Sequence, residues 1–290
     1  MIFEIANTVI AVSVVGALIS LAFLLPEING DLTEVADKTK KFLLNASILW
    51  VFTSMGNFIA TLAQIFDSAI SEVIRVNVIR SFATQITLGK LLIFQIVTAL
   101  LVAFFARRLK KNGGAVWLLL IAILGVVAPV FQSHSSSLGS HGLAIGSLVI
   151  HVIALCFWVG TVGALLLMTD DVRTQVFSRV SAIALWASSF VLVSGILNAW
   201  TRLRLSDAWF TSYGLLIGLK VLLTLAVVVV AARLRKGIGV KHLASFELVT
   251  LALIVSIGSV LTQFTPIEDA PQSFDKSENL SASRCHKNQI

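Results

Sequence analysis

The apolar residues of this chain form long, nearly uninterrupted runs, not the alternating pattern of a half-buried strand. About 20 consecutive apolar residues make a helix long enough to cross the hydrocarbon core of a bilayer. Lipid offers the backbone no hydrogen bonds, so such runs predict helices and not a barrel, whose strands would alternate. The chain is therefore predicted to be an all-α, polytopic membrane helical bundle. We expect eight transmembrane helices, at 5–25, 42–66, 83–107, 115–132, 143–168, 178–200, 213–234 and 244–264.

The composition fits this class, with 57% hydrophobic and only 13% charged residues. The first run has no basic segment before it and no small-residue cleavage site behind it, so we expect a retained helix. Residues 1–266 are predicted to form one eight-helix membrane domain, and 267–290 a polar tail with a disordered composition. The two cysteines, Cys156 and Cys285, lie in a predicted helix and in the tail, which rules out a disulfide framework.

The positive charges behind the net charge of +7 are concentrated in alternate connections between the predicted helices. This pattern is typical of a membrane protein, so we expect the lipid bilayer and no nucleic acid as a partner. Thirteen lysines and arginines fall in the first, third, fifth and seventh connections, and four in the others. By the positive-inside rule, both termini and the uncharged fourth connection then face outward. The thirteen are Lys38, Lys40, Lys41, Arg107, Arg108, Lys110, Lys111, Arg173, Arg179, Arg233, Arg235, Lys236 and Lys241.

Three of the five histidines, His134, His141 and His151, lie within eighteen positions near the expected outer face. His151 is eight residues inside its helix, roughly 12 Å along the axis, which is too deep for an imidazole to reach the interface. Two interpretations fit it: a ligand for a metal or haem iron, or a histidine bonded to a hydroxyl of a neighbouring helix. His134 and His141 flank a flexible loop, which either folds over a site whose floor is His151 or is simply a solvated loop.

Other side chains in the predicted spans have weaker functional signals. Met55 is either a thioether ligand for Cu(I) or a packing residue. Trp158 shares a stripe with Ser147 and His151, while Cys156 points away from it and is expected to be a small buried hydrophobe. Gly160 and Ala164 form a small-xxx-small pair that predicts the close approach of another helix.

Lys90 and Lys220 are expected to extend to the interface, or else to bind an anion or an internal ion-pair partner. Several uncharged polar residues could bond across helices or line a path. They are Asn57, Gln64, Gln85, Ser188, Ser189, Ser194, Asn198 and Gln263. The chain has no nucleophile–base pairing, phosphate-binding loop or HExxH motif, so we expect no enzymatic activity.

The sequence resembles the copper resistance D (CopD) family of bacterial membrane proteins, most clearly over residues 131–266. The resemblance begins with "SHSSSLGSHG" and "LVIHVIALCFWVGTVGALLL", similar to the family's outer-loop histidine and its H-x6-W-x-G helix. It continues through "FSRVSAIALWASSFVLVSGILNAW", "FTSYGLLIGLKVLLTLAVVVVAARLRK" and the acidic start of "FELVTLALIVSIGSVLTQFTP". His134 and His151 match the family's histidines. The chain is also similar to the N-terminal unit of actinobacterial fusions with a CtaG-like oxidase assembly domain, a domain that we do not expect here.

The resemblance implies a copper-handling protein of the cytoplasmic (inner) membrane of a bacterium. Such a protein would capture copper ions at the outer face through His134, His141 and His151, for import or for transfer to an outer-face copper chaperone or a cytochrome oxidase subunit. Two alternatives stay open at this point. One is a membrane cytochrome that binds haem b through His151 and His134. The other is a non-transporting protein of copper assembly into cytochrome oxidase.

Overall fold

The computed structural model describes residues 2–28, 31–32, 36–132, 141–168 and 170–202, and a few positions between 215 and 249. In this part of the chain, six helices are long and apolar enough to cross a membrane, and they match the first six predicted spans. The predicted spans 213–234 and 244–264 and the tail 267–290 lie outside the described residues, apart from those few positions. The protein is thus a multi-pass helical membrane protein.

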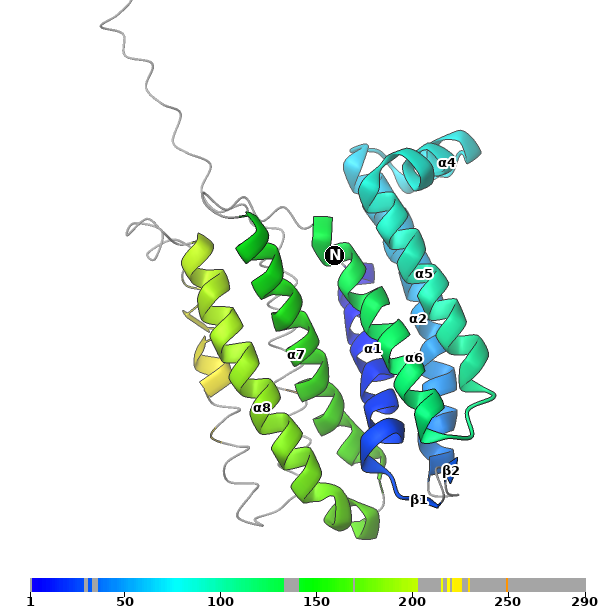
Figure 1. Cartoon of the computed structure of the whole chain (residues 1–290). Helices are drawn as coiled ribbons and strands as arrows, with labels where there is room; N and C mark the ends of the chain where they lie inside the picture. The colour runs from blue at the N-terminus through cyan, green and yellow to red at the C-terminus, as the bar shows by residue number, and fades with distance from the viewer. Residues whose placement is uncertain are drawn as a thin grey trace, which may run out of the picture.

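The six long helices run alternately up and down (Figure 1). Helix α1 continues as one π-helical turn, and α6 as a short 3-10 helix. Their bounds are α1 Ile2–Ile19 with η1 Ser20–Leu24, α2 Asp37–Ile65, α5 Thr87–Ala106, α6 Asn112–Val127 with η3 Ala128–Gln132, α7 His141–Leu167 and α8 Asp170–Arg202.

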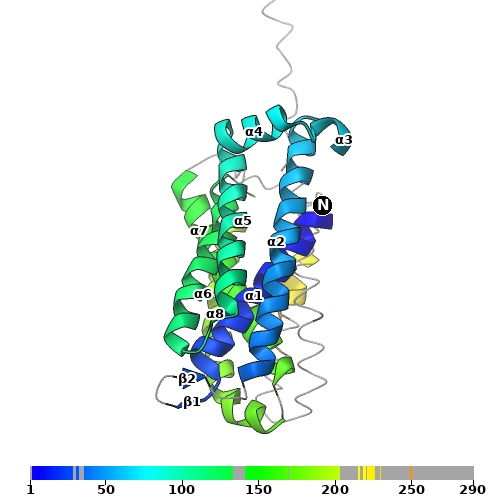
Figure 2. The ribbon, with the colours of Figure 1, turned by 90° about the vertical axis from the view of Figure 1, so that its right-hand side faces the viewer.

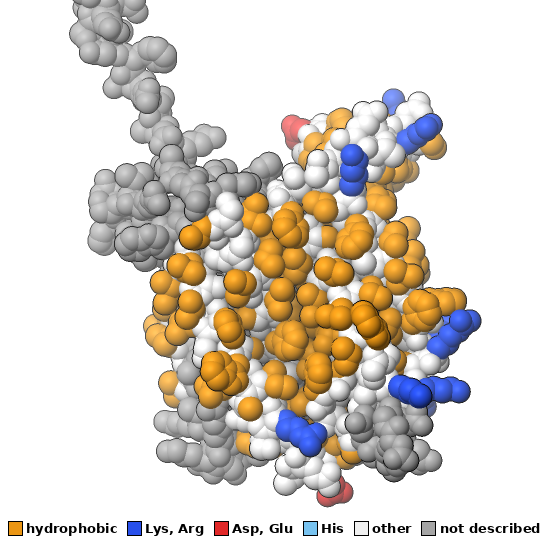
Figure 3. Space-filling view, viewed as in Figure 1, with side chains coloured by type: hydrophobic (Ala, Val, Ile, Leu, Met, Phe, Trp, Pro, Cys, Tyr) orange, Lys and Arg blue, Asp and Glu red, His pale blue; other side chains and the backbone are white. Residues whose placement is uncertain are grey.

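Helix α1 is the centre of the bundle, and it is the most buried of the six spans. It packs against α2, α6 and α7, while α7 also packs along α8 (Figures 1 and 2). Figure 3 shows apolar side chains across the face of the bundle that it views, with lysine and arginine near its ends. This is the surface that a lipid bilayer solvates, with charged groups placed where water and headgroups begin.

The second connection contains two short helices that the apolar pattern did not predict, α3 (Ile70–Val73) and α4 (Val76–Gln85). Helix α4 escaped prediction because it is amphipathic and short, and not a continuous apolar run. It lies across the ends of α2 and α5 (Figure 2). Its Phe82 is fully buried and packs against Phe58 of α2, with ring centroids 5.0 Å apart. A Cβ atom at Gly89 of α5 would collide with the Phe82 carbonyl, so this corner requires glycine.

At the opposite end of the bundle, the first connection forms a two-residue antiparallel ladder between β1 (Glu27–Ile28) and β2 (Asp31–Leu32). The backbone nitrogen of Leu32 donates to the carbonyl oxygen of Lys110 at 2.8 Å. This bond joins the first connection to the third. The two basic connections therefore lie together at one end, as the charge pattern predicts.

The close helix approach predicted at Gly160 is confirmed, and the neighbour is α1. A Cβ atom built on Gly160 would lie 2.7 Å from the Cα of Gly16, closer than real Cβ atoms come to backbone. The two backbones thus touch directly, as small residues allow in membrane helix pairs. Gly160 and His151 point in opposite directions on α7, since nine residues correspond to about two and a half turns. Helix α7 therefore meets α1 with one face and α8 with the other.

Candidate functional site

The imidazole of His151 is held between α7 and α8. Its side chain is only 9% exposed, and its Nδ1 lies 3.0 Å from the Oγ of Ser194 on α8. One turn nearer the start of α7, the hydroxyl of Ser147 donates to Oδ1 of Asn198 at 2.7 Å. Residues four apart share a helix face, so two antiparallel helices bring the two pairs together as successive layers. Ser194 and Asn198 thus belong to the polar residues that do bond across helices.

The hydrogen bond to Ser194 is compatible with both interpretations of His151. A structural histidine in lipid needs such a partner, because an unsatisfied polar group in hydrocarbon is costly. A metal-ligating histidine has the same need, since its second ring nitrogen is almost always bonded to an orienting group. The geometry therefore permits metal ligation without requiring it.

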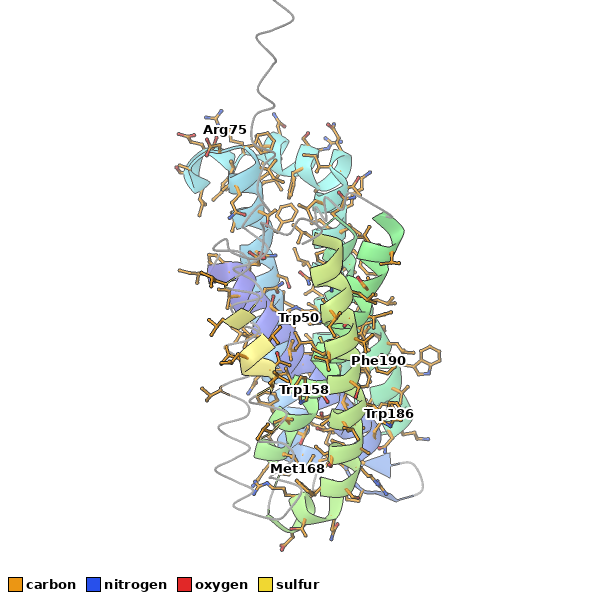
Figure 4. All side chains as sticks on the ribbon, turned by 90° about the vertical axis from the view of Figure 1, so that its left-hand side faces the viewer. Trp50, Arg75, Trp158, Met168, Trp186 and Phe190 are labelled. Atoms are coloured by element: carbon orange, nitrogen blue, oxygen red, sulfur yellow. The ribbon has the colours of Figure 1, made fainter. Side chains whose placement is uncertain are left out.

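Beyond His151, the surface that α7 turns toward α8 becomes apolar. Trp158, two turns further along α7 on the same face, is 2% exposed and lies inside the bundle (Figure 4). On α8, Ala187 and Val191 are buried at the corresponding level. Within the described residues, the face of α7 that carries Ser147 and His151 is thus apolar from Ala154 to Trp158.

The described part of the chain does not show His134 or His141 next to His151. His134 lies outside it. His141 is the first residue of α7 and not part of a loop. Ten helical residues place His151 about 15 Å further along α7 than His141. Among the described residues, no group of three or more His, Cys, Asp or Glu side chains could hold a metal ion.

The remaining predicted residues lie apart from His151. Met55 is 51% exposed on α2, which α1 separates from α7 (Figure 1). Lys90 is exposed in the first turn of α5, close to the helix end, where its ammonium reaches the interface easily. Lys220 lies outside the described residues. Cys156 is buried, as expected of a small hydrophobe.

A second buried polar cluster was missed in the sequence. Asn7 of α1 donates through Nδ2 to Oε1 of Gln95 on α5 at 3.0 Å, and its Oδ1 accepts from Ser54 of α2 at 2.8 Å. Gln95 in turn donates to the carbonyl oxygen of Gly125 on α6 at 3.2 Å. The signal was an amide within each of two apolar runs, the same signal that marked Asn57 and Gln64. Because these bonds link four helices, we regard the cluster as structural.

Comparison with protein-family models identifies both halves of the chain. Residues 3–143 match the N-terminal domain of copper resistance protein D-like proteins, and residues 174–261 match copper resistance protein D. The chain belongs to the copper resistance protein D family. The family resemblance seen in the sequence is thereby confirmed. Comparisons with curated proteins and with solved structures give no match.

The family assignment identifies a membrane protein concerned with copper resistance and handling. The first match covers α1 to α6 and ends in the first turn of α7, and the second begins inside α8. His151 and Trp158 lie in the stretch between the two matches. Their role in this copper resistance protein D family member is therefore argued from their placement.

Proposed function

We propose that this protein captures copper ions at the outer face of a bacterial cytoplasmic membrane and carries them inward or transfers them to a partner protein. The observation that carries the proposal is the buried imidazole of His151, at the α7–α8 contact of a protein from a copper-handling family. Imidazole suits copper, and a buried titratable group within a membrane span marks a functional site by default.

The geometry favours successive binding positions over one three-histidine site. His141 begins α7 at the end of the bundle that carries α4, and His151 lies about 15 Å deeper along the same helix. Copper would bind first near His141, with His134 close by in the sequence, and then at His151. Movement past Trp158 would require α7 and α8 to change their packing. The recipient is either the far side of the membrane or an outer-face acceptor, such as a copper chaperone or a cytochrome oxidase subunit.

The test is the copper content of the purified full-length protein, wild type against His151→Ala. His286→Ala, in the polar tail, is the matched control. We expect His151→Ala to bind copper at least tenfold more weakly than wild type, and the control to bind it as wild type does. Tenfold is roughly the smallest effect of removing a group that only orients a metal ligand. Equal copper in wild type and His151→Ala would contradict the proposal. A reducible Soret band in the wild-type absorption spectrum would favour a haem protein instead.

A further inference from the structure

The start of α2 and the α5–α6 connection together carry a group of basic side chains, at the end of the bundle opposite α4. The two stretches are far apart in the sequence, and the 2.8 Å backbone bond from Leu32 to Lys110 holds their connections together. All of these side chains are exposed or partly exposed. We call them the basic patch, which consists of Lys38, Lys40, Lys41, Arg107, Arg108, Lys110 and Lys111.

Acidic residues do not neutralise the basic patch. Its described ion pair joins Asp37 to Lys40 at 2.6 Å. The second connection, residues 66–86 at the other end, has two acidic and two basic residues and therefore no net charge. The two connections that form the patch have three more basic than acidic residues. Their acidic residues are Glu27, Asp31, Glu34 and Asp37.

The α5–α6 connection presents its cations on an anchored backbone. The N–H of Arg108 donates to the carbonyl oxygen of Phe105 at 2.9 Å. Leu109, between two basic residues on each side, is buried and packs into the main apolar core. Because this backbone is already ordered, binding an anion here costs less conformational entropy than binding it to a free polybasic segment.

The basic patch adjoins the apolar surface that lipid solvates. Phe104, in the last turn of α5, is 53% exposed, and the guanidinium carbon of Arg108 lies 4.5 Å from the centre of its ring. This cation–π contact holds a cation at the edge of the lipid-facing surface. Figure 3 shows lysine and arginine directly beside the apolar face at this end. The patch thus lies at the level of lipid headgroups, which favours a lipid over an acidic soluble protein as its partner.

We propose that the basic patch binds the headgroup phosphate of an anionic phospholipid, and that the start of α2 and the α5–α6 connection contribute to one site. Lysine binds phosphate as a point charge, and arginine binds it through two parallel N–H groups. By the positive-inside rule, this end faces the cytoplasmic leaflet, whose surface is negatively charged. The bound lipid would join the two connections a second time, beside the Leu32–Lys110 bond. The site does not depend on the proposed copper function.

The experiment is native mass spectrometry of the full-length protein in detergent, titrated with phosphatidylglycerol or with phosphatidylcholine. One double variant is Lys38→Gln with Lys41→Gln, a second is Lys110→Gln with Lys111→Gln, and a quadruple variant combines them. These changes preserve the bond to Leu32, because it uses the backbone of Lys110 and not its side chain.

The matched control is Arg75→Gln with Arg80→Gln, which removes two exposed cations from the other end of the bundle. Thermal unfolding of every variant without lipid should match wild type, since all the altered side chains are exposed. A second control adds inorganic phosphate at the concentration of the lipid, to separate a lipid site from a site for any phosphate.

We expect wild type to bind its first phosphatidylglycerol more tightly than phosphatidylcholine. Each double variant should weaken that first binding by about fivefold for each lysine removed, and the control should not change it. Equal binding of the two lipids, or an equal loss in the control, would overturn the proposal. So would displacement of the lipid by inorganic phosphate. If both double variants keep the first tight binding and only the quadruple variant loses it, the two stretches form separate sites and the single site is wrong.

Discussion

At the scale of single residues, Gly160 of α7 lies directly against the backbone of Gly16 on α1. Gly160 was predicted to admit another helix, and it does, but nothing local could name Gly16, 144 residues earlier, as the residue it meets. In the same way, Ser194 was one of eight polar candidates. Choosing it required the register between α7 and α8, which is set by packing along their whole lengths and not by any one residue.

The Gly16–Gly160 contact leads to a prediction about stability. Gly160→Ala should destabilise the protein, because its Cβ would collide with backbone, which cannot move aside as a flexible side chain can. We expect a loss of about 1–3 kcal/mol. Gly146→Ala, on the same helix with nothing within 4 Å of the added Cβ, is the control and should be neutral or slightly stabilising. Equal thermal unfolding of the two variants in detergent would show that the contact is not as tight as described.

At the scale of elements, continuous apolar runs were sufficient to predict the long helices. For the first six spans, most predicted ends lie within a few residues of the observed helix ends. The exception is α8, which begins eight residues earlier than the predicted 178. Its first two turns contain charged residues such as Asp171 and Arg173, which a search for apolar runs excludes. Helix α4 was missed for a related reason: its one-sided pattern is typical of a helix lying on an interface, not one crossing it.

The amide cluster predicts a coupling between elements. Gln95→Leu should lower the stability of the bundle by about 1–2 kcal/mol, because it removes the bonds to Asn7 and to the Gly125 carbonyl at once. Gln64→Leu replaces an exposed glutamine on α2 and is the control. The measurement is denaturant unfolding in mixed micelles. A Gln95→Leu protein as stable as the control would mean that these bonds contribute no net stability.

At the scale of the whole molecule, the charge pattern predicts an orientation that labelling can check. Arg75, beside α4, and Lys110, beside the β1–β2 ladder, are exposed at opposite ends of the bundle. Arg75→Cys and Lys110→Cys should be made in a Cys285→Ser background. In spheroplasts, an impermeant maleimide should label position 75 directly and position 110 only after permeabilisation, by the positive-inside rule. The reverse pattern would place both termini inside if the chain has eight spans.

The connections at the two ends of the first four long helices also limit which helices can move relative to one another. Helix α4 joins α2 to α5 at one end, and the Leu32–Lys110 bond joins the α1–α2 and α5–α6 connections at the other. Helices α7 and α8 meet this unit mainly along α1, through the Gly16–Gly160 contact and the buried apolar side chains beside it. The 3.0 Å contact joins His151 to Ser194, so a rocking motion of α7 and α8 against this unit would carry the two residues together. An ion bound at His151, as we propose, would then change the side of the membrane it faces while the contact between His151 and Ser194 stays intact.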